Sequence, residues 1–245
     1  MNDTIRLLQF HTSIRNFKAD PIEDDIVKTI ISAAQCTASS NFVQACTVIR
    51  VRNQDTRNKM AELAGNQPYV TSAPVFLMFC ADLHRAEVCC DMHEKEMLSG
   101  FTEQFIIATT DVALMAQTAV VAAESLGLGI CYIGGIRNHP AEYTELLELP
   151  EHVYPVFGLC LGYPDQSPET KPRLPVDIVL KEETYGNKDE KEAIAEYDDL
   201  MREYYKNRSS NIKQMGWSEQ MAELLGKESR PHMKAFLESQ GFKMR

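Results

Sequence analysis

The chain has 245 residues, of which 44% are hydrophobic and 24% are charged, and its formal net charge is −10. This composition is typical of a globular protein, and the length suits one large domain, because single hydrophobic cores stop growing near ~250–300 residues. An acidic chain repels nucleic acid and anionic lipid over most of its surface. The composition therefore argues against a disordered, nucleic-acid-binding or membrane-surface protein.

The cellular compartment is indicated by what the sequence contains near its start and by its cysteines. The first residues, MNDTIRLLQFHTSIRNF, contain no long apolar run of the kind found in a secretion signal. The cysteines number seven, and most lie in apolar stretches such as FLMFC, so we expect reduced core thiols. These features predict a cytoplasmic protein.

Hydrophobic periodicity and breaker residues predict the secondary structure in chain order. Helices are predicted at residues 3–9, from Pro21 to the polar run that starts at Thr37, and at 54–63, 84–98, 104–126, 142–147, 190–205, 218–226 and 230–240. Strands are predicted at residues 47–51, 73–80, 130–133 and 156–161. The continuous apolar run at 73–80 is typical of a strand covered on both faces. Few, scattered strands favour an α+β fold over a regular β-α barrel.

The predicted helix at 104–126 is apolar nearly all round, which is typical of a central helix. Asp111, Gln117 and Glu124 interrupt the apolar stretch, which favours a buried helix over a membrane span. Such a helix needs cover on every side, and a dimer partner could supply part of it. Beyond the extended segment Lys171–Pro175, residues from about 176 to 245 are predicted to form a helical extension of a single domain, 1–245.

Several common site motifs are absent from the sequence. In Gly127-Leu-Gly129 the third glycine of a dinucleotide fingerprint would fall at Tyr132, and the order of elements is helix then strand, the reverse of that motif. No phosphate loop and no Gly-x-Ser-x-Gly elbow occurs. A cluster of His and Cys residues lies between His84 and His93, but it has no second ligand pair. We therefore favour a charged surface helix there and expect no metal.

Two cationic motifs are candidate anion sites, and one turn is a candidate ligand platform. His11-Thr-Ser-Ile-Arg15 and Lys171-Pro-Arg173 each place basic groups close together, which suits a phosphate. Taken alone, each motif fits a solvated surface somewhat better. The Gly-Gly pair that ends Tyr132–Gly135 would let a flat ligand approach the backbone, although a plain tight turn explains it equally.

The basic residues are concentrated near the C-terminus. Residues 200–245 carry a charge of +4 and the rest of the chain −14. This imbalance suits a small anionic ligand, and ordinary fluctuation explains it as well.

A series of segments in order resembles the FMN-dependent NADPH nitroreductase and flavin reductase family. They are HTSIR, ASSNFVQA, GNQPYV, AAESLGLGICYIGGIRN, VFGLCLGYP and KPRLP, followed by EYYKNR, WSEQ and KESRP. The resemblance is greatest to the branch of oxygen-insensitive major nitroreductases and NADPH–flavin oxidoreductases. It implies an α+β fold with a central mixed sheet flanked by helices, and an intertwined homodimer with two FMN sites at the interface.

The resemblance also implies a set of residues around FMN. These are His11, Thr12, Ser13, Ile14, Arg15, Ser39, Gln67, Tyr132, Ile133, Gly134, Gly135, Lys171, Pro172 and Arg173. Arg15, with the cations of Lys171–Arg173, would hold the phosphate, and Gln67 would bond the pyrimidine edge. Ser39 would come from the other subunit, and Tyr132–Gly135 would line the isoalloxazine. Thr12 departs from the arginine usual in the first motif.

The implied reaction takes hydride from NADPH to the flavin N5 and passes it to nitro compounds, quinones or free flavin by a ping-pong mechanism. The cofactor carries this chemistry, so no catalytic side chain is needed. Arg208 and Arg230 would contact the NADPH 2′-phosphate, and the alternative is a structural role for both. The alternatives for the whole protein are an NADH-using reductase, a supplier of reduced FMN, and a non-enzymatic flavin-binding protein. The physiological acceptor and any redox role of Cys46 or Cys131 are not encoded in recognisable motifs.

Overall fold

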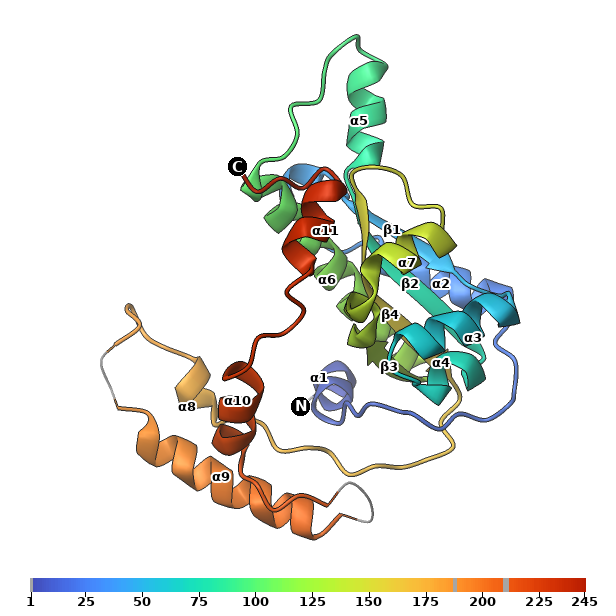
Figure 1. Cartoon of the computed structure of the whole chain (residues 1–245). Coiled ribbons are helices and arrows are strands. Elements are labelled where there is room, and N and C mark those ends of the chain that lie inside the picture. Colours follow the sequence, from blue (N-terminus) through green and yellow to red (C-terminus); the bar gives the residue numbers. More distant parts are fainter. Residues whose placement is uncertain (1, 187–188, 209–211) are drawn as a thin grey trace. The chain divides into compact units, whose positions relative to one another are not determined.

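The computed structural model describes residues 2–186, 189–208 and 212–245 (Figure 1). The chain packs as two compact units. The main unit comprises the chain up to Pro168 together with Arg230–Arg245, and the extension unit comprises Glu169–Ser229. Each unit is described by itself below.

The main unit is built on a four-stranded sheet in the order β1-β2-β4-β3. The strands are β1 (Cys46–Arg50), β2 (Val75–Asp82), β3 (Gly129–Ile133) and β4 (Val153–Gly162). All of their pairings are antiparallel. The resemblance implied a mixed sheet, but parallel pairing in the described residues is limited to one bridge, Ser13 to Ile130. The segment before Ser13 is too briefly aligned with β3 to become a fifth strand.

Strand β2 is buried along its whole length, which confirms the prediction of a strand covered on both faces. Its residues alternate between two hydrophobic clusters. Leu77 and Phe79 belong to one cluster, and Phe76 and Met78 belong to the other. Side chains alternate across a strand, so the two clusters are the cores on the two faces of the sheet.

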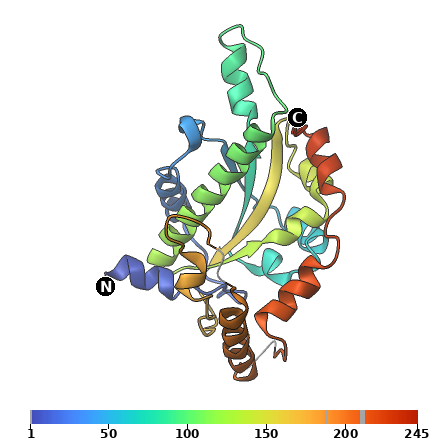
Figure 2. The same cartoon turned by 90° about the vertical axis from the view of Figure 1, so that its left-hand side faces the viewer.

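Helices form a layer on each face of the sheet (Figure 2). One face packs against α2 (Asp24–Ala34) and α6 (Thr102–Ser125), and Phe236 and Leu237 of α11 (Met233–Ser239) join the same hydrophobic cluster. The other packs against α3 (Gln54–Leu63), α4 (Pro68–Ser72), the 3₁₀ helix η2 (Gly134–Asn138) and α7 (Pro140–Leu146). Helix α1 (Asp3–Gln9) contacts α6.

Helix α6 has the length and composition of a membrane-crossing helix. Its inner face is fully buried against the sheet, as at Ala108 and Val112. Its outer face carries exposed apolar side chains, with Ile106 50% and Leu114 42% exposed. The inner face is that of a core helix, and the outer face is the part that lacks cover in a single chain.

Most predicted elements occur with ends shifted by a few residues, and the main exception is the helix predicted at 84–98. Helix α5 covers only His84–Asp91 and extends away from the sheet (Figure 1). Glu94 adopts a positive φ of 54°, a conformation that cannot continue a right-handed helix. The short helices α4 and η2 were not predicted, because one or two turns leave no periodic pattern.

The extension unit contains α8 (Val176–Val179), α9 (Lys191–Lys206) and α10 (Trp217–Leu225). Its small core consists of Tyr197, Met201 and Tyr205 on α9, with Trp217 packed against them. The buried Asp198 accepts hydrogen bonds from the Ser218 backbone N–H at 2.7 Å and from the Ser218 hydroxyl. These bonds cap the start of α10. The helices predicted at 190–205 and 218–226 are thereby confirmed.

Candidate functional site

The segment His11–Arg15 is held against the outer edge of β3. The Ile14 N–H donates to the Ile130 carbonyl at 2.8 Å, and the Ile14 side chain is buried. A Cβ on Gly129 would lie 2.5 Å from the Ile14 side chain, so this glycine permits the close approach. In an extended segment neighbouring side chains point to opposite sides. Ser13 and Arg15, which flank Ile14, therefore point away from the core that buries Ile14.

The side-chain amide of Gln67 is fixed at both ends. Its Nε2 donates to the Ala64 carbonyl at 2.7 Å, and its Oε1 accepts from the Tyr69 hydroxyl at 2.7 Å. A primary amide has two N–H donors and two lone pairs on oxygen. One donor and one acceptor of Gln67 consequently remain for a ligand, and this combination suits the alternating N–H and C=O groups of a pyrimidine edge.

Helix α4, which follows Gln67, is anchored by a buried arginine. The Arg57 guanidinium donates to the carbonyl of Val70 at 2.7 and 3.0 Å and to that of Ala73 at 2.5 Å. Burial lowers the pKa of Arg57. These bonds satisfy carbonyls at the end of the helix that would otherwise be left without partners, and they fix the position of Gln67 through α4.

Gly135 packs directly on this amide. A Cβ at Gly135 would lie 2.4 Å from the Ala64 carbonyl oxygen and 2.8 Å from Gln67 Nε2. At the preceding Gly134 the nearest atom is Nη2 of Arg137, at 3.3 Å. The structure thus brings together the Gly-Gly turn after β3 and Gln67, two features that the sequence predicted separately.

Arg15 lies near Tyr69, whose hydroxyl donates to the Gln67 amide. Burial raises the pKa of Tyr69, the nearby Cys131 adds to the shift, and the Arg15 guanidinium opposes it. The Arg15 backbone N–H donates to Gln166 Oε1 at 3.2 Å. Arg15, Tyr69, Gln67 and Gly135 therefore form one cluster, which we call the Gln67 cluster.

His11 is paired with a carboxylate from the end of α6. Its Nδ1 lies 2.6 Å from Glu124 Oε1, and both side chains are largely buried. Burial, together with Glu124, raises the pKa of Tyr132. The Tyr132 ring packs edge-on against Phe157, with 5.1 Å between ring centroids, and its hydroxyl donates to Gln117 at 3.4 Å. Glu124 thus orients His11 next to the predicted ring-lining segment. Thr12 and Ile133 lie in the two segments just described, and Ile133 is buried.

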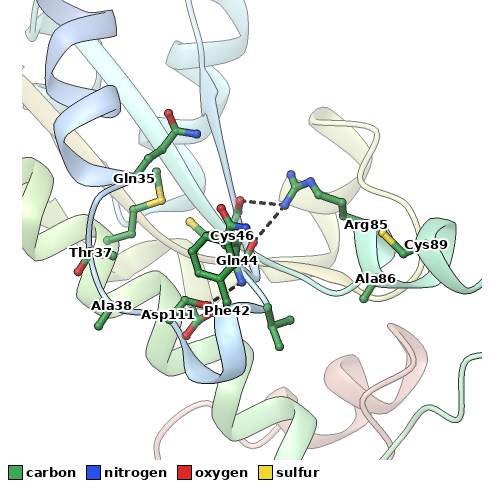
Figure 3. Close-up of a pocket in the computed structure, with 13 residues that line it drawn as sticks. Gln35, Thr37, Ala38, Phe42, Gln44, Cys46, Arg85, Ala86, Cys89 and Asp111 are labelled. Atoms are coloured by element: carbon green, nitrogen blue, oxygen red, sulfur yellow. Dashed lines mark hydrogen bonds between the residues drawn. The ribbon is translucent and has the colours of Figure 1, made fainter.

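Ser39 contacts α6 at Asp111, and it lies at the start of a turn that contains the 3₁₀ helix η1 (Ser40–Phe42). It lines a pocket of about 580 Å³ together with Phe42, Gln44, Arg85, Asp111 and Met115 (Figure 3). None of the Gln67 cluster lines this pocket. Within one chain, the structure therefore does not bring Ser39 to that cluster.

Lys171, Pro172 and Arg173 belong to the extension unit. The Pro172 carbonyl accepts a hydrogen bond from the Tyr197 hydroxyl at 2.9 Å, and Arg173 lowers the pKa of Tyr197 against the larger effect of burial, which raises it. The start of the unit is thereby fastened to α9.

Three cations surround Tyr205 on α9. The Nζ atoms of Lys171 and Lys213 each lie 5.5 Å from its ring centroid, and the Arg208 guanidinium carbon lies 6.0 Å from it. Burial favours a raised pKa for Tyr205, but the two lysines lower it below its ordinary value. These residues, which we call the Tyr205 cation cluster, make a local positive field suited to a phosphate.

Arg230 lies in the main unit rather than in the extension unit. Its Nε donates to Asn138 Oδ1 at 3.0 Å, and its Nη2 donates to the Gly134 carbonyl at 3.4 Å. The guanidinium therefore braces both ends of η2, next to the Gly-Gly turn. The structural role considered for Arg230 would therefore be to hold η2 in place.

Tyr69, Glu124 and Lys213 are site residues that the sequence reasoning missed. Tyr69 stood in the quoted segment GNQPYV, two residues after Gln67, and that spacing was the available signal. Glu124 acts on His11 across 113 residues of sequence, so no local pattern could reveal it. Lys213 lies in the basic C-terminal segment, but only the fold brings it to Tyr205.

The buried cysteines have the properties of structural thiols. Burial raises the pKa of Cys46 to about 12 and also raises that of Cys131, while Arg15 lowers the latter only in part. A thiolate is the reactive form of cysteine, so neither residue has the environment of a redox-active thiol. In residues 2–186, 189–208 and 212–245, no group of three or more His, Cys, Asp or Glu residues could hold a metal ion.

The fold and the Gln67 cluster define a class of α+β proteins in which a sheet edge and a Gly-Gly turn form a platform for a flat ligand. Family models of the nitroreductase family match residues 8–163 and, for its C-terminal domain, residues 171–245. The chain belongs to the nitroreductase family.

Similar proteins cover the full chain. The oxygen-insensitive NADPH nitroreductase of Salmonella typhimurium is 44% identical over 100% of both chains. The NADPH-flavin oxidoreductase of Vibrio harveyi is also 44% identical over 100% of both chains. The solved structure of Bacillus megaterium NfrA1 has a TM-score of 0.95 at 44% identity and covers 99% of this chain and 100% of its own. The nitroreductase-like fold expected from the resemblance is confirmed.

The close contact at Gly135 generates a prediction for the apoprotein. Gly135→Ala should lower the free energy of unfolding by roughly 1–3 kcal/mol, because the added Cβ overpacks against the Ala64 carbonyl and Gln67. The matched control, Gly134→Ala, meets only the Arg137 guanidinium at 3.3 Å and no backbone atom within 4 Å among its three nearest atoms, so it should cost less. Urea unfolding followed by fluorescence measures both values. Equal stability of the two variants would contradict the packing described here.

Proposed function

We propose that this protein is a cytoplasmic, FMN-dependent oxidoreductase that takes hydride from NADPH and reduces nitro compounds, quinones or free flavin. The observation that carries the proposal is the Gln67 cluster, in which an oriented amide, a glycine without room for a side chain and a nearby arginine form one platform. Full-length relatives that are named NADPH nitroreductase and NADPH-flavin oxidoreductase support the redox assignment.

The residues present fit an FMN. The donor and acceptor that Gln67 keeps suit the pyrimidine edge, and Gly134 and Gly135 would let the ring approach the backbone of η2. The family resemblance assigns Arg15, Lys171 and Arg173 to the phosphate, and their cationic groups suit it. Thr12, Ser13, Ile14, Pro172 and the Tyr132–Ile133 backbone would complete the surroundings, with His11 oriented by Glu124.

Bound FMN would supply the two-electron chemistry, accepting hydride from NADPH and passing it to the acceptor. The protein's part is to bind, orient and exclude water. Gln67 is held by two internal hydrogen bonds and would keep its remaining groups aimed without reorganising. The buried side chains of Ile14 and Ile133 would exclude water from the base of the site. No acid or base side chain is required by this scheme.

The Tyr205 cation cluster supports NADPH as the donor. Arg208, with Lys213 beside the same ring, would bind the 2′-phosphate that distinguishes NADPH from NADH. Arg230 is the second residue proposed for this contact. Its bonds to Asn138 and Gly134 leave its Nη1 as the group that could reach a phosphate.

A homodimer would complete the site. The outer face of α6 exposes Ile106 and Leu114, α5 exposes Val88, and Phe42 is 76% exposed beside the pocket. Exposed apolar groups of this number are typical of protein–protein interfaces. A second copy would cover them and would bring its Ser39 to the Gln67 cluster of the first. Small-molecule electron acceptors are the other partners that we propose, without nucleic acid or membrane.

The proposal as a whole is tested by the colour of the protein. We expect the purified protein to be yellow, and anaerobic NADPH should bleach the flavin absorption band, with colour returning when a nitroaromatic or quinone is added. Absorption spectroscopy under argon measures both steps. A yellow protein that NADPH does not bleach would be a flavin-binding protein without this activity, and a colourless protein that cannot bind added FMN would refute the cofactor assignment.

Arg208→Ala should raise the KM for NADPH by roughly ten- to hundredfold, because a hydrogen bond to a charged group contributes about 1.5–3 kcal/mol. The KM for NADH should stay the same, since NADH has no 2′-phosphate. Steady-state kinetics with both donors measure the effect. Arg202→Ala is the matched control, because Arg202 lies on α9 six residues before Arg208 and is paired with Asp199 and Glu219. Equal changes for NADPH and NADH would rule out the 2′-phosphate role.

Ile106→Glu should convert a dimer into a monomer that binds FMN weakly, because the charge would be buried against the second copy. Sedimentation velocity and flavin fluorescence measure the two effects. Leu146→Glu on α7, 36% exposed and outside the α5–α6 surface, should leave the dimer intact. A wild-type protein that sediments as a monomer with FMN bound would contradict the dimer proposal.

A further inference from the structure

Asp111 is a buried carboxylate in the middle of the apolar helix α6. Its side chain is enclosed, with the residue only 4% exposed. A carboxylate removed from water is costly unless hydrogen bonds compensate it. The position of such a residue on a core helix calls for a specific set of donors.

The donors all come from the loop Ser39–Ala45, between α2 and β1. The Ser39 hydroxyl donates to Asp111 Oδ2 at 2.6 Å, the Ser40 N–H to Oδ1 at 3.1 Å, and the Ala45 N–H to Oδ2 at 3.1 Å. The Asp111 carboxylate on α6 therefore holds the start and the end of the loop together.

The loop between these ends has an unfavourable backbone conformation. Asn41, Phe42 and Gln44 have φ angles of 47°, 58° and 54°. Residues with a Cβ rarely adopt positive φ, and such conformations persist where the surroundings impose them. The bonds to Asp111 are the constraint that the structure provides. The result is a turn whose tip presents Phe42, 76% exposed, at the rim of the pocket.

The same bonds determine what Ser39 can offer to a ligand. A hydroxyl has one donor and two acceptor positions. The donor is used by Asp111, and one acceptor position receives the Gln44 N–H at 2.7 Å. The Ser39 hydroxyl therefore keeps a single lone pair, and it can accept a hydrogen bond from a ligand N–H or O–H but cannot donate one to a ligand carbonyl or phosphate oxygen.

We propose that Asp111 is a positioning residue for the reductase reaction, which fixes the Ser39–Ala45 loop so that Ser39 meets the bound flavin or acceptor as a hydrogen-bond acceptor and Phe42 stands at the pocket rim. The proposal rests on the function proposed above. Ser39 would face a donor group such as a ribityl hydroxyl. An asparagine at position 111 would place an N–H₂ group where two backbone N–H groups and a hydroxyl converge. At least one of the hydrogen bonds that hold the loop to α6 would then be lost.

The chain offers a matched control on the same helix. Thr118, seven residues further along α6, bonds Thr37 Oγ1 at 3.1 Å and the Leu114 carbonyl at 2.9 Å. Thr118→Val therefore removes a polar link between α6 and the segment before the loop, without touching residues 39–45. It reports what a general weakening of this contact does.

The experiment compares wild type, Asp111→Asn, Ser39→Ala, the double variant and Thr118→Val as purified holoproteins. Stopped-flow spectroscopy under argon gives the rate of flavin bleaching by NADPH, and steady-state assays with a nitrobenzoate give KM and kcat, all normalised to bound flavin. Hydrogen exchange of the Ser40 and Ala45 amides reports the loop directly. Ser39→Ala is a loop variant that leaves the core helix unchanged, so it keeps the test decisive if Asp111→Asn fails to fold.

We expect Asp111→Asn and Ser39→Ala each to lower the flavin-normalised kcat/KM for the nitrobenzoate about tenfold, with the double variant no worse than the poorer single one, because residues of one network are not additive. Amide exchange at positions 40 and 45 should accelerate in Asp111→Asn, and Thr118→Val should stay within about twofold of wild type on every readout.

Two results would overturn the proposal. The first is an Asp111→Asn protein that is less heat-stable but has wild-type rates per bound flavin, which would make the role purely structural. The second is full additivity of the two single variants. Failure of the proposed function is distinguishable, because in that case NADPH would not bleach the wild-type protein. Amide exchange at Ser40 and Ala45 would still test whether Asp111 holds the loop.

Discussion

The burial of the sheet on both faces is the constraint on which the rest of the main unit depends. Strands β2 and β4 are covered by helices on each side, so they have almost no polar surface to offer. Polar groups are consequently confined to the edge strands β1 and β3 and to the segments that connect the layers. The segment His11–Arg15 uses that edge through its bridge to Ile130, and the Gly-Gly turn follows where β3 ends. The location of the Gln67 cluster is a consequence of where the sheet is not covered.

Buried charges then hold the connecting segments in place, and three of them act in the same manner. Arg57 binds carbonyls at the end of α4, Asp111 binds N–H groups of the Ser39–Ala45 loop, and Asp198 binds the Ser218 amide in the first turn of α10. In each case one charged side chain on a helix satisfies backbone groups of a neighbouring segment. A charged group makes stronger hydrogen bonds than a neutral one, which suits short segments that have little apolar surface of their own. The order of the loops thus depends on polar contacts, while the order of the layers depends on apolar burial.

The sequence could predict those features whose cause is local. Periodic apolar patterns located α6 and β2, and short motifs identified Arg15, Gln67 and Gly135 before any contact between them was known. Contacts between distant segments were beyond its reach. The pairing of His11 with Glu124, the enclosure of Asp111 by a loop 66 to 72 residues away, and the bracing of η2 by Arg230 all depend on tertiary packing. Asp111 illustrates the difference, because in the sequence it appears only as an interruption of an apolar helix, whereas in the fold it is fully hydrogen-bonded. The helix predicted at 84–98 was wrong beyond Asp91, because a positive φ at Glu94 is not visible in a pattern of polar residues.

The Gln67 cluster and the Tyr205 cation cluster differ in a way that suits the two nucleotides proposed for them. The Gln67 cluster is rigid and mostly uncharged apart from Arg15, and its fixed amide and close-packed glycine suit a resident ring that does not leave. The Tyr205 cation cluster lies on a helix with a small core and consists of long, flexible lysine and arginine side chains around one aromatic ring. Such cations attract an anion over a distance and release it with little reorganisation. A ping-pong reductase requires this combination, since the hydride donor has to bind and leave in each cycle while the flavin stays. The basic C-terminal part of an otherwise acidic chain is consistent with the same requirement.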